Sequence, residues 1–324
     1  MSEDGWNARA LPDLSGRSYL VTGANAGLGY FASEQLARAG AHVLMSGRNP
    51  NRLRAARAAL VERVPRASVE SLLLDTSNLG SVRAAAASVR ARKKLDGLLL
   101  NAGSVHPARS REVTREGNEL VLATNALGHF VLAGELLLPL AAARGRMVWL
   151  GSMSTSLWKY DVTVDPQLEQ HYSAWRAYVQ SKVFTTVLGF QAHRRLRQAR
   201  IPVASVVAHP GYSVSGRTPR IAGVNEPSWW DRFSDGLQAP ITQSKERGAA
   251  NLVRALIDPD ISSGDYVGPA RTVKGAPGRA KAAVYTRSPA LGATVWNAAE
   301  EATRFEWPLR RGGLGSRFFA RLGR

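Results

Sequence analysis

Short apolar runs alternate with longer amphipathic stretches along the first two thirds of the chain. The runs cover residues 18–22, 42–46, 69–74, 97–100, 147–150 and 203–207, and a last short one follows at 266–267. Each run is apolar at nearly every position, which is typical of strands covered on both faces. The stretches between them are long enough to form helices, so the pattern predicts βαβ units with right-handed crossovers. We therefore expect an α/β fold with one doubly wound parallel sheet of about seven strands in a single domain.

The pattern changes in the last third of the chain. Glycine, proline, serine and tryptophan are frequent over 212–242, so we interpret this segment as a mobile cover over the carboxyl ends of the strands. Helices are expected over 244–257 and over 296–307. We assign the sheet domain to residues 1–270, and a basic C-terminal extension that is partly helical or disordered to residues 271–324.

The longest apolar stretch, Leu120 to Ala143, is interrupted by Asn125, His129 and Glu135. A buried helix explains it better than a membrane span, which needs ~20 consecutive apolar residues. In that helix we interpret His129 as a packing residue. The first residues of the chain contain acids and lack an apolar core, so they do not form a secretory signal. The sequence therefore indicates a soluble, cytoplasmic protein.

Composition excludes several kinds of chemistry. The chain contains no cysteine, which rules out disulfides, cysteine-ligated metals and a thiol nucleophile. The six histidines show no spacing typical of metal ligands. We therefore predict no metal site.

The formal net charge is +18, and 36 of the 43 basic residues are arginine. The arginines are scattered along the chain, as on a solvated surface, and no nucleic-acid-binding motif accompanies them. The alternative interpretation is attraction to acidic partners such as anionic lipid or the phosphates of a cofactor. Basic and aromatic residues interleave from Arg304 to Arg324, but glycines within 312–315 disfavour a continuous amphipathic helix. We expect no nucleic-acid partner, and at most weak contact of this tail with an anionic membrane.

A glycine-rich turn follows the first predicted strand. Thr22, Gly23, Gly27 and Gly29 stand in the sequence TGANAGLG, and a predicted helix comes next. Glycine permits a tight turn and a close approach of the backbone to a pyrophosphate, and the N-terminus of a helix offers unpaired N–H groups to phosphate. The order of strand, turn and helix is the context that distinguishes such a site from a turn that only packs. The motif therefore predicts a Rossmann-type, dinucleotide-binding sheet.

The end of the second predicted strand bears on the choice of cofactor. Sites specific for NAD place an acidic residue there, about 20 residues after the turn, to bind the ribose hydroxyls. No acid occurs between Val43 and Val61, and Arg48 stands in this region. A guanidinium suits the 2′-phosphate of NADP through paired hydrogen bonds, and Ser46 and Asn49 could add further ones. The alternative is that Arg48 is an ordinary solvated arginine; we favour NADP(H) over NAD(H).

A tyrosine and a lysine four residues apart form a candidate pair for proton transfer. Tyr178 and Lys182 lie in a predicted helix, where this spacing puts them on one face. A phenol with a pKa of ~10 is a weak acid or base at neutral pH, and a neighbouring ammonium lowers that pKa. Tyr160 and Tyr172 have valine and arginine at the same spacing. The pattern therefore selects Tyr178 as the acid/base candidate.

Further candidates follow the predicted strands directly. Ser152, Asp75, Asn101–Gly103 and Pro210–Gly211 each come at the end of a strand, whereas Asn125 lies within a predicted helix despite its poor helix propensity. Ligands of doubly wound sheets bind at the carboxyl ends of the strands. We therefore expect these residues to meet at one site.

Together these motifs resemble the short-chain dehydrogenase/reductase family. TGANAGLG, DTS, NAG, the helix asparagine, the strand-end serine, YVQSK and PG occur in the order and at the spacings of that family. The resemblance covers residues 14–268. TNALGHF, YVQSK and AHPGYS more narrowly resemble the retinol-dehydrogenase-like and WW-domain-oxidoreductase-like branch, which includes bacterial members.

The resemblance implies a role for each catalytic candidate. Tyr178 would be the general acid/base, and Lys182 would lower its pKa and hold the nicotinamide ribose. Ser152 would orient the carbonyl of the substrate. Asn125 would hold a water in a proton relay to Lys182.

Other residues would surround the cofactor. By the same resemblance, Asp75 would contact the adenine, Asn101 the adenosine ribose region, and Pro210–Gly211 the nicotinamide amide. The hydroxyl that assists Pro210–Gly211 could be that of Ser213, Ser215 or Thr218. The implied cofactor-binding set is Gly23, Asn25, Ala26, Gly27, Leu28, Gly29, Arg48, Asp75, Thr76, Asn101, Ala102, Gly103, Lys182, Pro210, Gly211 and Ser213.

These observations predict an oxidoreductase that moves a hydride between NADP(H) and a carbonyl or alcohol. Aromatic residues over 158–175 and 229–233 favour a small-molecule substrate that is bulky and apolar. A homodimer or homotetramer is expected as well. The alternative is a non-catalytic protein that binds or senses NADP on the same fold, since a fold does not fix a function.

Overall fold

The computed structural model describes residues 6–7, 10–105, 107–157 and 161–309 of the 324-residue chain. Its main sheet has eight strands in the order β10–β9–β6–β5–β4–β1–β2–β3. They are β1 (Ser18–Val21), β2 (His42–Gly47), β3 (Ser68–Leu73), β4 (Gly97–Leu100), β5 (Arg146–Leu150), β6 (Ala204–Ala208), β9 (Tyr266–Pro269) and β10 (Pro277–Arg279). All neighbours pair in parallel except β10, which is antiparallel to β9. The strand order changes direction between β1 and β4, which is where doubly wound sheets bind their ligands.

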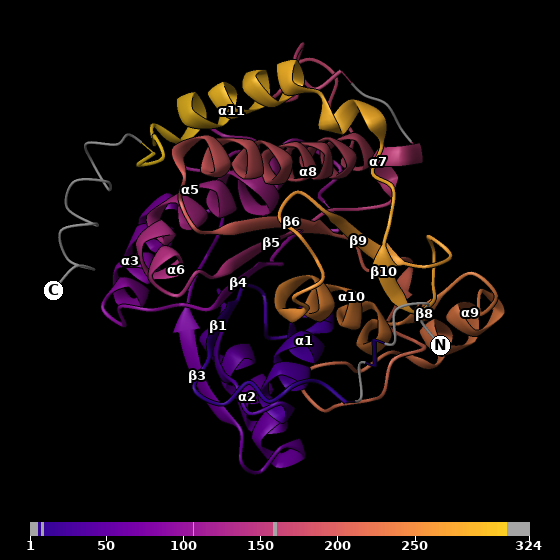
Figure 1. Ribbon diagram of the computed structural model, residues 1–324. Helices are drawn as coiled ribbons and strands as arrows, with labels where there is room; N and C mark the ends of the chain where they lie inside the picture. The colour runs from indigo at the N-terminus through magenta and orange to yellow at the C-terminus, as the bar shows by residue number, and fades with distance from the viewer. Residues whose placement is uncertain (1–5, 8–9, 106, 158–160, 310–324) are drawn as a thin grey trace, which may run out of the picture.

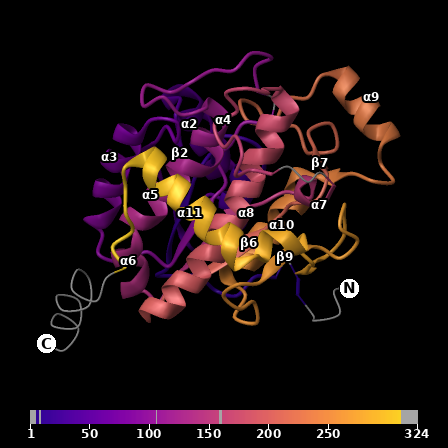
Figure 2. The same ribbon diagram turned by 90° about the horizontal axis from the view of Figure 1, so that it is seen from above.

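Helices cover both faces of the sheet (Figure 1). They are α1 (Gly27–Arg38), α2 (Pro50–Arg63), α3 (Leu79–Arg90), α4 (Leu120–Leu122), the π-helix η1 (Ala123–Leu127), α5 (Gly128–Glu135), α6 (Leu137–Ala142), α7 (Ser154–Leu157), α8 (Ala174–Ala199), α10 (Lys245–Ile257), the 3-10 helix η2 (Val284–Arg287) and α11 (Pro289–Thr303). The helices α1, α2 and α10 lie on one face, and α3, α5 and α8 lie on the other. Outside α8 lies α11, which crosses it in the view of Figure 2. The sheet is therefore enclosed between helical layers. Loops follow the carboxyl ends of its strands, where a ligand would bind.

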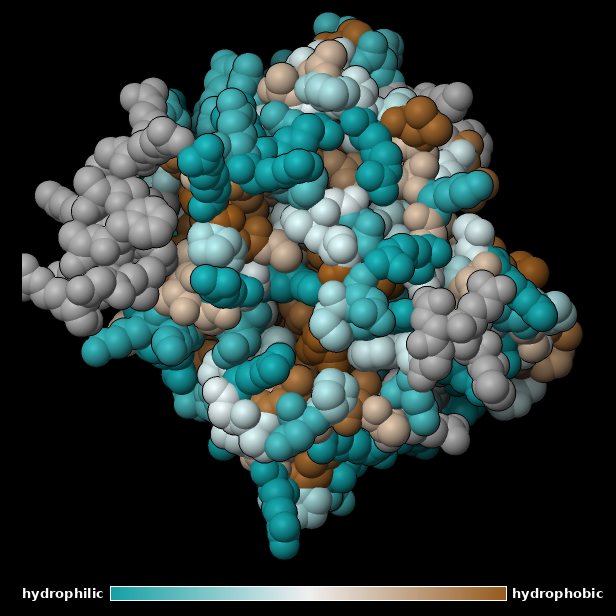
Figure 3. All heavy atoms as spheres, viewed as in Figure 1, coloured by the Kyte–Doolittle hydropathy of each residue, from teal (hydrophilic) through white to brown (hydrophobic). Residues whose placement is uncertain are grey.

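Successive side chains of the central strands β1 and β4 enter different cores. Leu20 and Leu98 pack with α3, α5 and α8, whereas Val21 and Leu99 pack with α1 and α10. This two-sided burial explains why the runs of the central strands are apolar rather than alternating, whereas the edge strand β3 is mostly exposed and carries Glu70. Hydrophilic side chains cover most of the molecular surface seen in Figure 3, as the high net charge leads one to expect.

The seven strands predicted from the apolar runs are confirmed, each within a residue or two of its expected bounds. The eighth strand, β10, was not predicted, because its sequence PGR contains no apolar run. The helix expected over 244–257 is confirmed as α10, which Ser244 caps by accepting a hydrogen bond from Arg247 N at 3.2 Å.

The helix expected over 296–307 was predicted with wrong bounds. Ser288 caps α11 and Pro289 takes its first position, so the helix begins seven residues earlier. It ends before Arg304, which adopts a left-handed φ of 48°. The chain then folds back, and Trp307 Nε1 donates to the carbonyl of Phe130 at 3.0 Å. Residues after 270 thus contribute an edge strand to the sheet and a helix against α8.

The apolar stretch from Leu120 to Ala143 forms α4, η1, α5 and α6 in succession, and most of it is buried. The helical path is not a single straight α-helix, because η1 interrupts it. Within the described part of the chain, no helix is both long and apolar enough to cross a membrane.

The segment 212–242 contains two short elements, β7 (Ser213–Val214) and the helix α9 (Trp229–Leu237); β7 pairs with β8 (Gln243–Ser244). No residue of α9 is buried, although its aromatic rings contact one another. The predicted mobility of this segment stays a prediction. The basic tail beyond Leu309, with its predicted membrane contact, and the aromatic residues 158 and 160 lie outside the described residues.

Candidate active site

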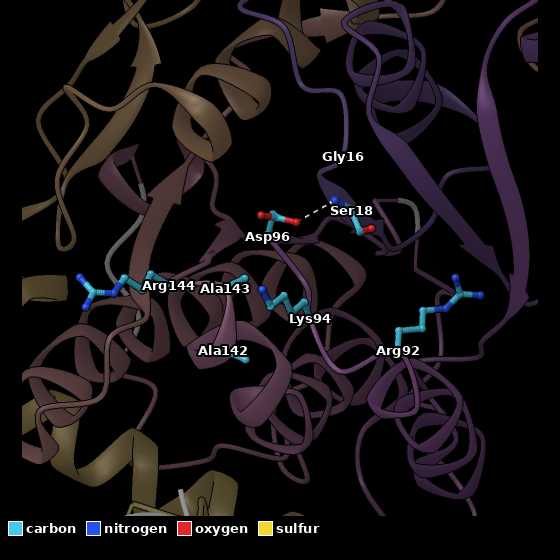
Figure 4. A pocket seen from close by; sticks show the side chains of 8 residues that line it. All are labelled: Gly16, Ser18, Arg92, Lys94, Asp96, Ala142, Ala143 and Arg144. Atoms are coloured by element: carbon cyan, nitrogen blue, oxygen red, sulfur yellow. Dashed lines mark hydrogen bonds between the residues drawn. The ribbon is translucent and has the colours of Figure 1, made fainter. Parts of the chain in front are cut away.

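The amino ends and the carboxyl ends of the strands differ in the residues that they present to a ligand. At the amino ends of β1 and β4 is a cavity of about 570 Å³, lined by Gly16, Ser18, Arg92, Lys94, Asp96, Ala142, Ala143 and Arg144. Figure 4 shows Asp96 in this cavity accepting a hydrogen bond from Ser18 N, at 2.8 Å. None of the predicted site residues lines it. They gather instead at the carboxyl ends of the strands, the edge at which doubly wound sheets bind ligands.

The glycine turn after β1 has the shape that a phosphate site requires. Gly23 and Gly27 have φ angles of 66° and 56°, which glycine adopts without strain. A Cβ on Gly29 would collide with the carbonyl oxygen of Gly23. No side chain caps α1, whose N-cap residue is Ala26, so its first N–H groups can bind an anion. The turn therefore fits the pyrophosphate of a dinucleotide.

The side chain of Asn101 fastens this turn to the end of β4. Its Nδ2 donates to the carbonyls of Thr22 at 2.7 Å and Gly23 at 3.4 Å. The backbone N–H groups of Asn101 and Ala102 both donate to Thr22 Oγ1, at 2.8 and 2.9 Å. Asn101 thus stabilises the shape of the phosphate turn. Its contact with the adenosine ribose stays a prediction.

Asn125 lies in the π-helix η1, where the wider turn displaces backbone groups from the α-helical pattern. Its carbonyl accepts a hydrogen bond from Thr185 Oγ1 at 3.1 Å and lies 3.1 Å from His129 Nδ1. Its side chain bonds both backbone groups of Ser104 and donates to Ser181 Oγ at 2.9 Å. Asn125 therefore links the segment after β4, beside Gly103, to the middle of α8. The predicted water relay stays a prediction.

The hydroxyl groups of Tyr178 and Ser152 lie 3.3 Å apart. Ser152 Oγ also accepts hydrogen bonds from Ser154 N at 3.1 Å and Ser154 Oγ at 2.9 Å. Because these two bonds occupy its lone pairs, the hydroxyl hydrogen of Ser152 can turn toward Tyr178 or a substrate oxygen. Burial raises the pKa of Tyr178 above its usual value, and the bond with Ser152 opposes that rise.

Lys182 lies one turn further along α8, fully buried, with its Nζ donating to the carbonyl of Leu150 at 2.9 Å. Loss of hydration lowers the pKa of its ammonium to about 8. The ammonium of Lys182 therefore lies against the last residue of β5, two residues before Ser152 in the chain. The lowering of the Tyr178 pKa by Lys182 stays a prediction, since burial governs the pKa of that phenol here.

Arg48 lies exposed just after β2. Within the described residues its guanidinium forms no hydrogen bond or ion pair, so it can accept an anionic partner. The two residues expected to assist it are engaged elsewhere: Ser46 is buried and donates to Val21 O at 3.2 Å, and Asn49 caps α2. Arg48 is therefore the least engaged of the three, and its contact with a 2′-phosphate, with any help from the Asn49 amide, stays a prediction.

Asn25 and Asp75 lie near the carboxyl ends of β2 and β3. A Cβ on Gly47 would be 2.9 Å from Asn25 Oδ1, which places the amide over the end of β2. Asp75 follows β3 and accepts hydrogen bonds from the backbone and hydroxyl of Ser77, at 3.0 and 2.7 Å. Thr76 is buried next to α5. Their contacts with a cofactor stay predictions.

The turn after β6 closes the other end of the site. Gly211 has a φ of 66°, and a Cβ there would collide with the carbonyl of Val273. The Pro210 carbonyl accepts hydrogen bonds from Ser213 Oγ at 2.9 Å and Gln243 Nε2 at 2.7 Å. Ser213 is thereby held against the turn; which hydroxyl assists Pro210–Gly211 in binding a cofactor stays a prediction.

Sequence reasoning missed three neighbours of these residues. His129 is buried, as a packing residue would be, but it also faces Thr22 Oγ1 through Nε2 at 2.9 Å. Ser154 orients Ser152, and Tyr266 Oη lies 3.5 Å from the Ser152 carbonyl. The repeated serine in GSMS and the spacing of four between Asn125 and His129 were the available signals.

The family model for short chain dehydrogenases matches residues 17–220, well over half of the chain. The chain belongs to the short-chain dehydrogenase/reductase family. This short-chain dehydrogenase is 31% identical over 259 residues to the WW domain-containing oxidoreductase of Pongo abelii, covering 77% of the chain and 60% of that protein. It is 33% identical over 263 residues to the polyprenol dehydrogenase of Mus musculus, covering 78% of the chain and 74% of that protein. These relatives confirm the family and the branch that the motifs indicated.

A solved structure of an uncharacterised protein from Mycobacterium Paratuberculosis is similar with a TM-score of 0.75 and 29% identity. The similarity covers 94% of this short-chain dehydrogenase and 99% of that chain. By contrast, the chain spans less than two thirds of the length of the WW domain-containing oxidoreductase. The doubly wound architecture, including the residues after 270, is therefore shared with a solved structure.

Proposed function

We propose that this short-chain dehydrogenase is an NADP(H)-dependent oxidoreductase acting on the carbonyl or alcohol group of an apolar small molecule. One observation supports the proposal above all. The hydroxyls of Tyr178 and Ser152 lie 3.3 Å apart at the carboxyl end of β5, and the buried Lys182 lies one helical turn from Tyr178. A protein that only binds a dinucleotide has no need of a buried lysine next to a serine–tyrosine pair.

Each of the three residues has a defined task in reduction. The carbonyl oxygen of the substrate accepts hydrogen bonds from Ser152 and Tyr178, which fixes its position. NADPH held at the glycine turn would supply the hydride for the carbonyl carbon. Tyr178 gives its phenol proton to the oxygen, which completes the alcohol. The ammonium of Lys182 stabilises the remaining phenolate, and oxidation of an alcohol reverses these steps.

The cofactor assignment depends on two features of the chain. The glycine turn with the unpaired N-terminus of α1 suits a pyrophosphate. The exposed Arg48, without an acidic residue between Val43 and Val61, suits a 2′-phosphate better than ribose hydroxyls. The first feature suits either dinucleotide, and the second favours NADP(H) over NAD(H).

The substrate assignment depends on exposed apolar side chains beside the site. Val105, Leu157, Trp175 and Tyr212 are exposed, and each is within a few residues of a predicted site residue. The Trp175 ring lies 5.8 Å from the Tyr178 ring. Apolar walls around a few polar groups are typical of pockets for apolar ligands. One relative is named for a polyprenol, an apolar alcohol. We expect such a substrate, turned over by a homodimer or homotetramer.

The decisive experiment replaces Tyr178 by phenylalanine and measures both NADPH binding and NADPH consumption with a panel of aldehydes and ketones. Y178F should lose turnover by roughly 100-fold or more, the scale of general acid catalysis, while NADPH affinity changes little. Tyr172→Phe is the matched control, since among the described residues the Tyr172 hydroxyl bonds the Ala108 carbonyl alone, at 2.9 Å. Near-normal turnover in Y178F would refute the mechanism. If the parent protein binds NADPH tightly but turns over no aldehyde or ketone of the panel, the non-catalytic alternative is favoured.

A further inference from the structure

The start of α10 packs directly against the phosphate turn. A Cβ on Gly248 would lie 2.9 Å from the Leu28 side chain and would collide with Ser213 Oγ. Leu28 belongs to the first turn of α1, and Ser213 follows the turn after β6. A glycine at position 248 therefore lets the N-terminus of α10 approach both ends of the cofactor site.

The first residue of α10 is Lys245, and its side chain reaches over the glycine turn. A Cβ on Gly27 would be 3.6 Å from Lys245 Cδ and 3.8 Å from its Nζ. The backbone N–H of Lys245 donates to Thr218 Oγ1 at 2.8 Å, and its Nζ donates to Ser215 Oγ at 2.6 Å. These two bonds come from the segment after Pro210–Gly211 and hold the ammonium above Gly27.

The charge of Lys245 is poorly compensated within the protein. Its Nζ forms no ion pair with a carboxylate of the described residues. Partial burial lowers the pKa of its amine, and the more distant Asp235 only partly opposes that effect. A half-buried ammonium whose one polar partner is a neutral hydroxyl is a costly arrangement unless an anion joins it.

We propose that Lys245 is a cofactor-binding residue whose ammonium binds the pyrophosphate of the dinucleotide above Gly27, opposite the N-terminus of α1. The inference rests on the proposed function, because that function supplies the dinucleotide. Lys245 adds a full charge to the partial charge of the helix N-terminus and the hydroxyls of Ser213 and Ser215. It also attaches α10 and the segment 212–242 to the phosphates, so that binding of cofactor orders that segment. The alternative is a purely structural role, in which Lys245 holds the segment after β6 in place through its hydrogen bond to Ser215.

Two fragments of the cofactor separate Lys245 from Arg48. ADP-ribose contains the pyrophosphate and lacks the 2′-phosphate, whereas 2′-AMP contains the 2′-phosphate and lacks the pyrophosphate. Binding of both, and of NADPH, is measured by calorimetry for the parent, K245Q and R48A. K245Q should weaken ADP-ribose and NADPH by about tenfold or more, the scale of a charged hydrogen bond, and leave 2′-AMP within about twofold. R48A should weaken binding of 2′-AMP and leave the affinity for ADP-ribose within about twofold.

Arg247→Gln is the matched control. Arg247 lies two residues further along α10, is exposed, and makes no described side-chain bond, so R247Q removes the same charge without reaching the turn. All three affinities should stay within about twofold of the parent. Lys245→Arg should restore most of the ADP-ribose affinity. Ser215→Ala should keep most of it as well, because the proposal assigns the binding to the ammonium rather than to the hydroxyl.

The outcomes distinguish the two proposals. Equal ADP-ribose affinity in K245Q and the parent would overturn the role of Lys245 and leave the cofactor site intact. If S215A and K245Q lose ADP-ribose affinity equally, and lose thermal stability to the same extent, the role of Lys245 is overturned in favour of the purely structural one. A parent that binds neither ADP-ribose nor NADPH would overturn the proposed function and this inference with it. If K245Q unfolds, K245R decides: full loss of ADP-ribose binding in a folded K245R contradicts an electrostatic contact.

Discussion

His129 should make the protein sensitive to mild acid. Its ring is completely buried, with Nδ1 3.1 Å from the Asn125 carbonyl and Nε2 2.9 Å from Thr22 Oγ1. A carbonyl can only accept, so Nδ1 carries the hydrogen and Nε2 is an acceptor facing the Thr22 hydroxyl, whose hydrogen can point to Nε2 or to the Leu99 carbonyl at 3.2 Å. Burial lowers the pKa of this imidazole to about 3, against about 6.5 in an unfolded chain. A second proton on the ring would have no partner.

The sign of the effect follows from the two protonation states. Between pH 6.5 and 3 the unfolded chain binds a proton at this histidine and the folded protein does not. The free energy of unfolding therefore falls as the pH falls, by about 1.4 kcal/mol per pH unit, or roughly 2 kcal/mol between pH 6.5 and 5. Burial lowers the pKa of His209, to about 4, and that of His193 as well, so both add to the slope in the same direction. Carboxyl groups titrate mainly below this window.

His129→Gln tests the reasoning, since glutamine can still donate to Asn125 and accept from Thr22. Urea unfolding at pH 5.0, 6.5 and 7.5 should show a shallower loss of stability in H129Q, by roughly 2 kcal/mol over the lower interval. His171→Gln, at an exposed position, controls for the loss of a histidine as such. Parallel pH profiles for H129Q and the parent would show that the buried ring takes up its proton without unfolding, and would refute the hydrogen-bonding scheme.

Three further outcomes are expected. Arg48→Ala should lower NADPH affinity by roughly 10- to 100-fold and leave NADH affinity nearly unchanged in fluorescence titrations; equal binding of NADPH and NADH by the parent would contradict the cofactor assignment. Lys182→Ala should lower both turnover and NADPH affinity, because the ammonium serves the phenolate and the ribose; a loss confined to either would remove one of its two roles. Hydrogen exchange over residues 212–242 should slow when NADPH and a substrate analogue bind; unchanged exchange would make the segment a fixed wall.

The sheet and the phosphate turn could be predicted because their signals are local. A strand such as β4 is buried on both faces, so its sequence GLLL is apolar without interruption. The residues of TGANAGLG are neighbours in sequence and in space, and glycine is required by the positive φ at Gly23 and Gly27. Tyr178 and Lys182 share one helix. Patterns of this kind need no knowledge of the rest of the chain.

The missed features depend on contacts between distant segments. The spacing of four relates His129 to Asn125, but His129 faces Thr22 across 107 positions of sequence, so its place beside the phosphate turn has no local sign. Trp296 and Trp307 pack edge to face with ring centroids 4.8 Å apart, although the sequence placed both in one helix. In fact the left-handed Arg304 lies between them and turns the chain back. Lys245 reaches the glycine turn only because Gly248 lets α10 approach, which no spacing along the sequence reveals.

The electrostatics of the site favour reduction at neutral pH. Burial raises the pKa of Tyr178, so the phenol holds its proton, which is the form that carbonyl reduction consumes and alcohol oxidation must first lose. Lys182, with its pKa lowered to about 8, is still mostly charged at pH 7 and can stabilise the phenolate left behind. As the pH rises through about 8, that charge is lost and the phenolate loses its partner. The kcat/KM for reduction should therefore be flat from pH 6 to 7.5 and fall above pH 8, as measured with the best carbonyl of the panel. A reductive rate that rises with pH through this range would mean that Tyr178 acts mainly as a base, and that the enzyme is built for oxidation.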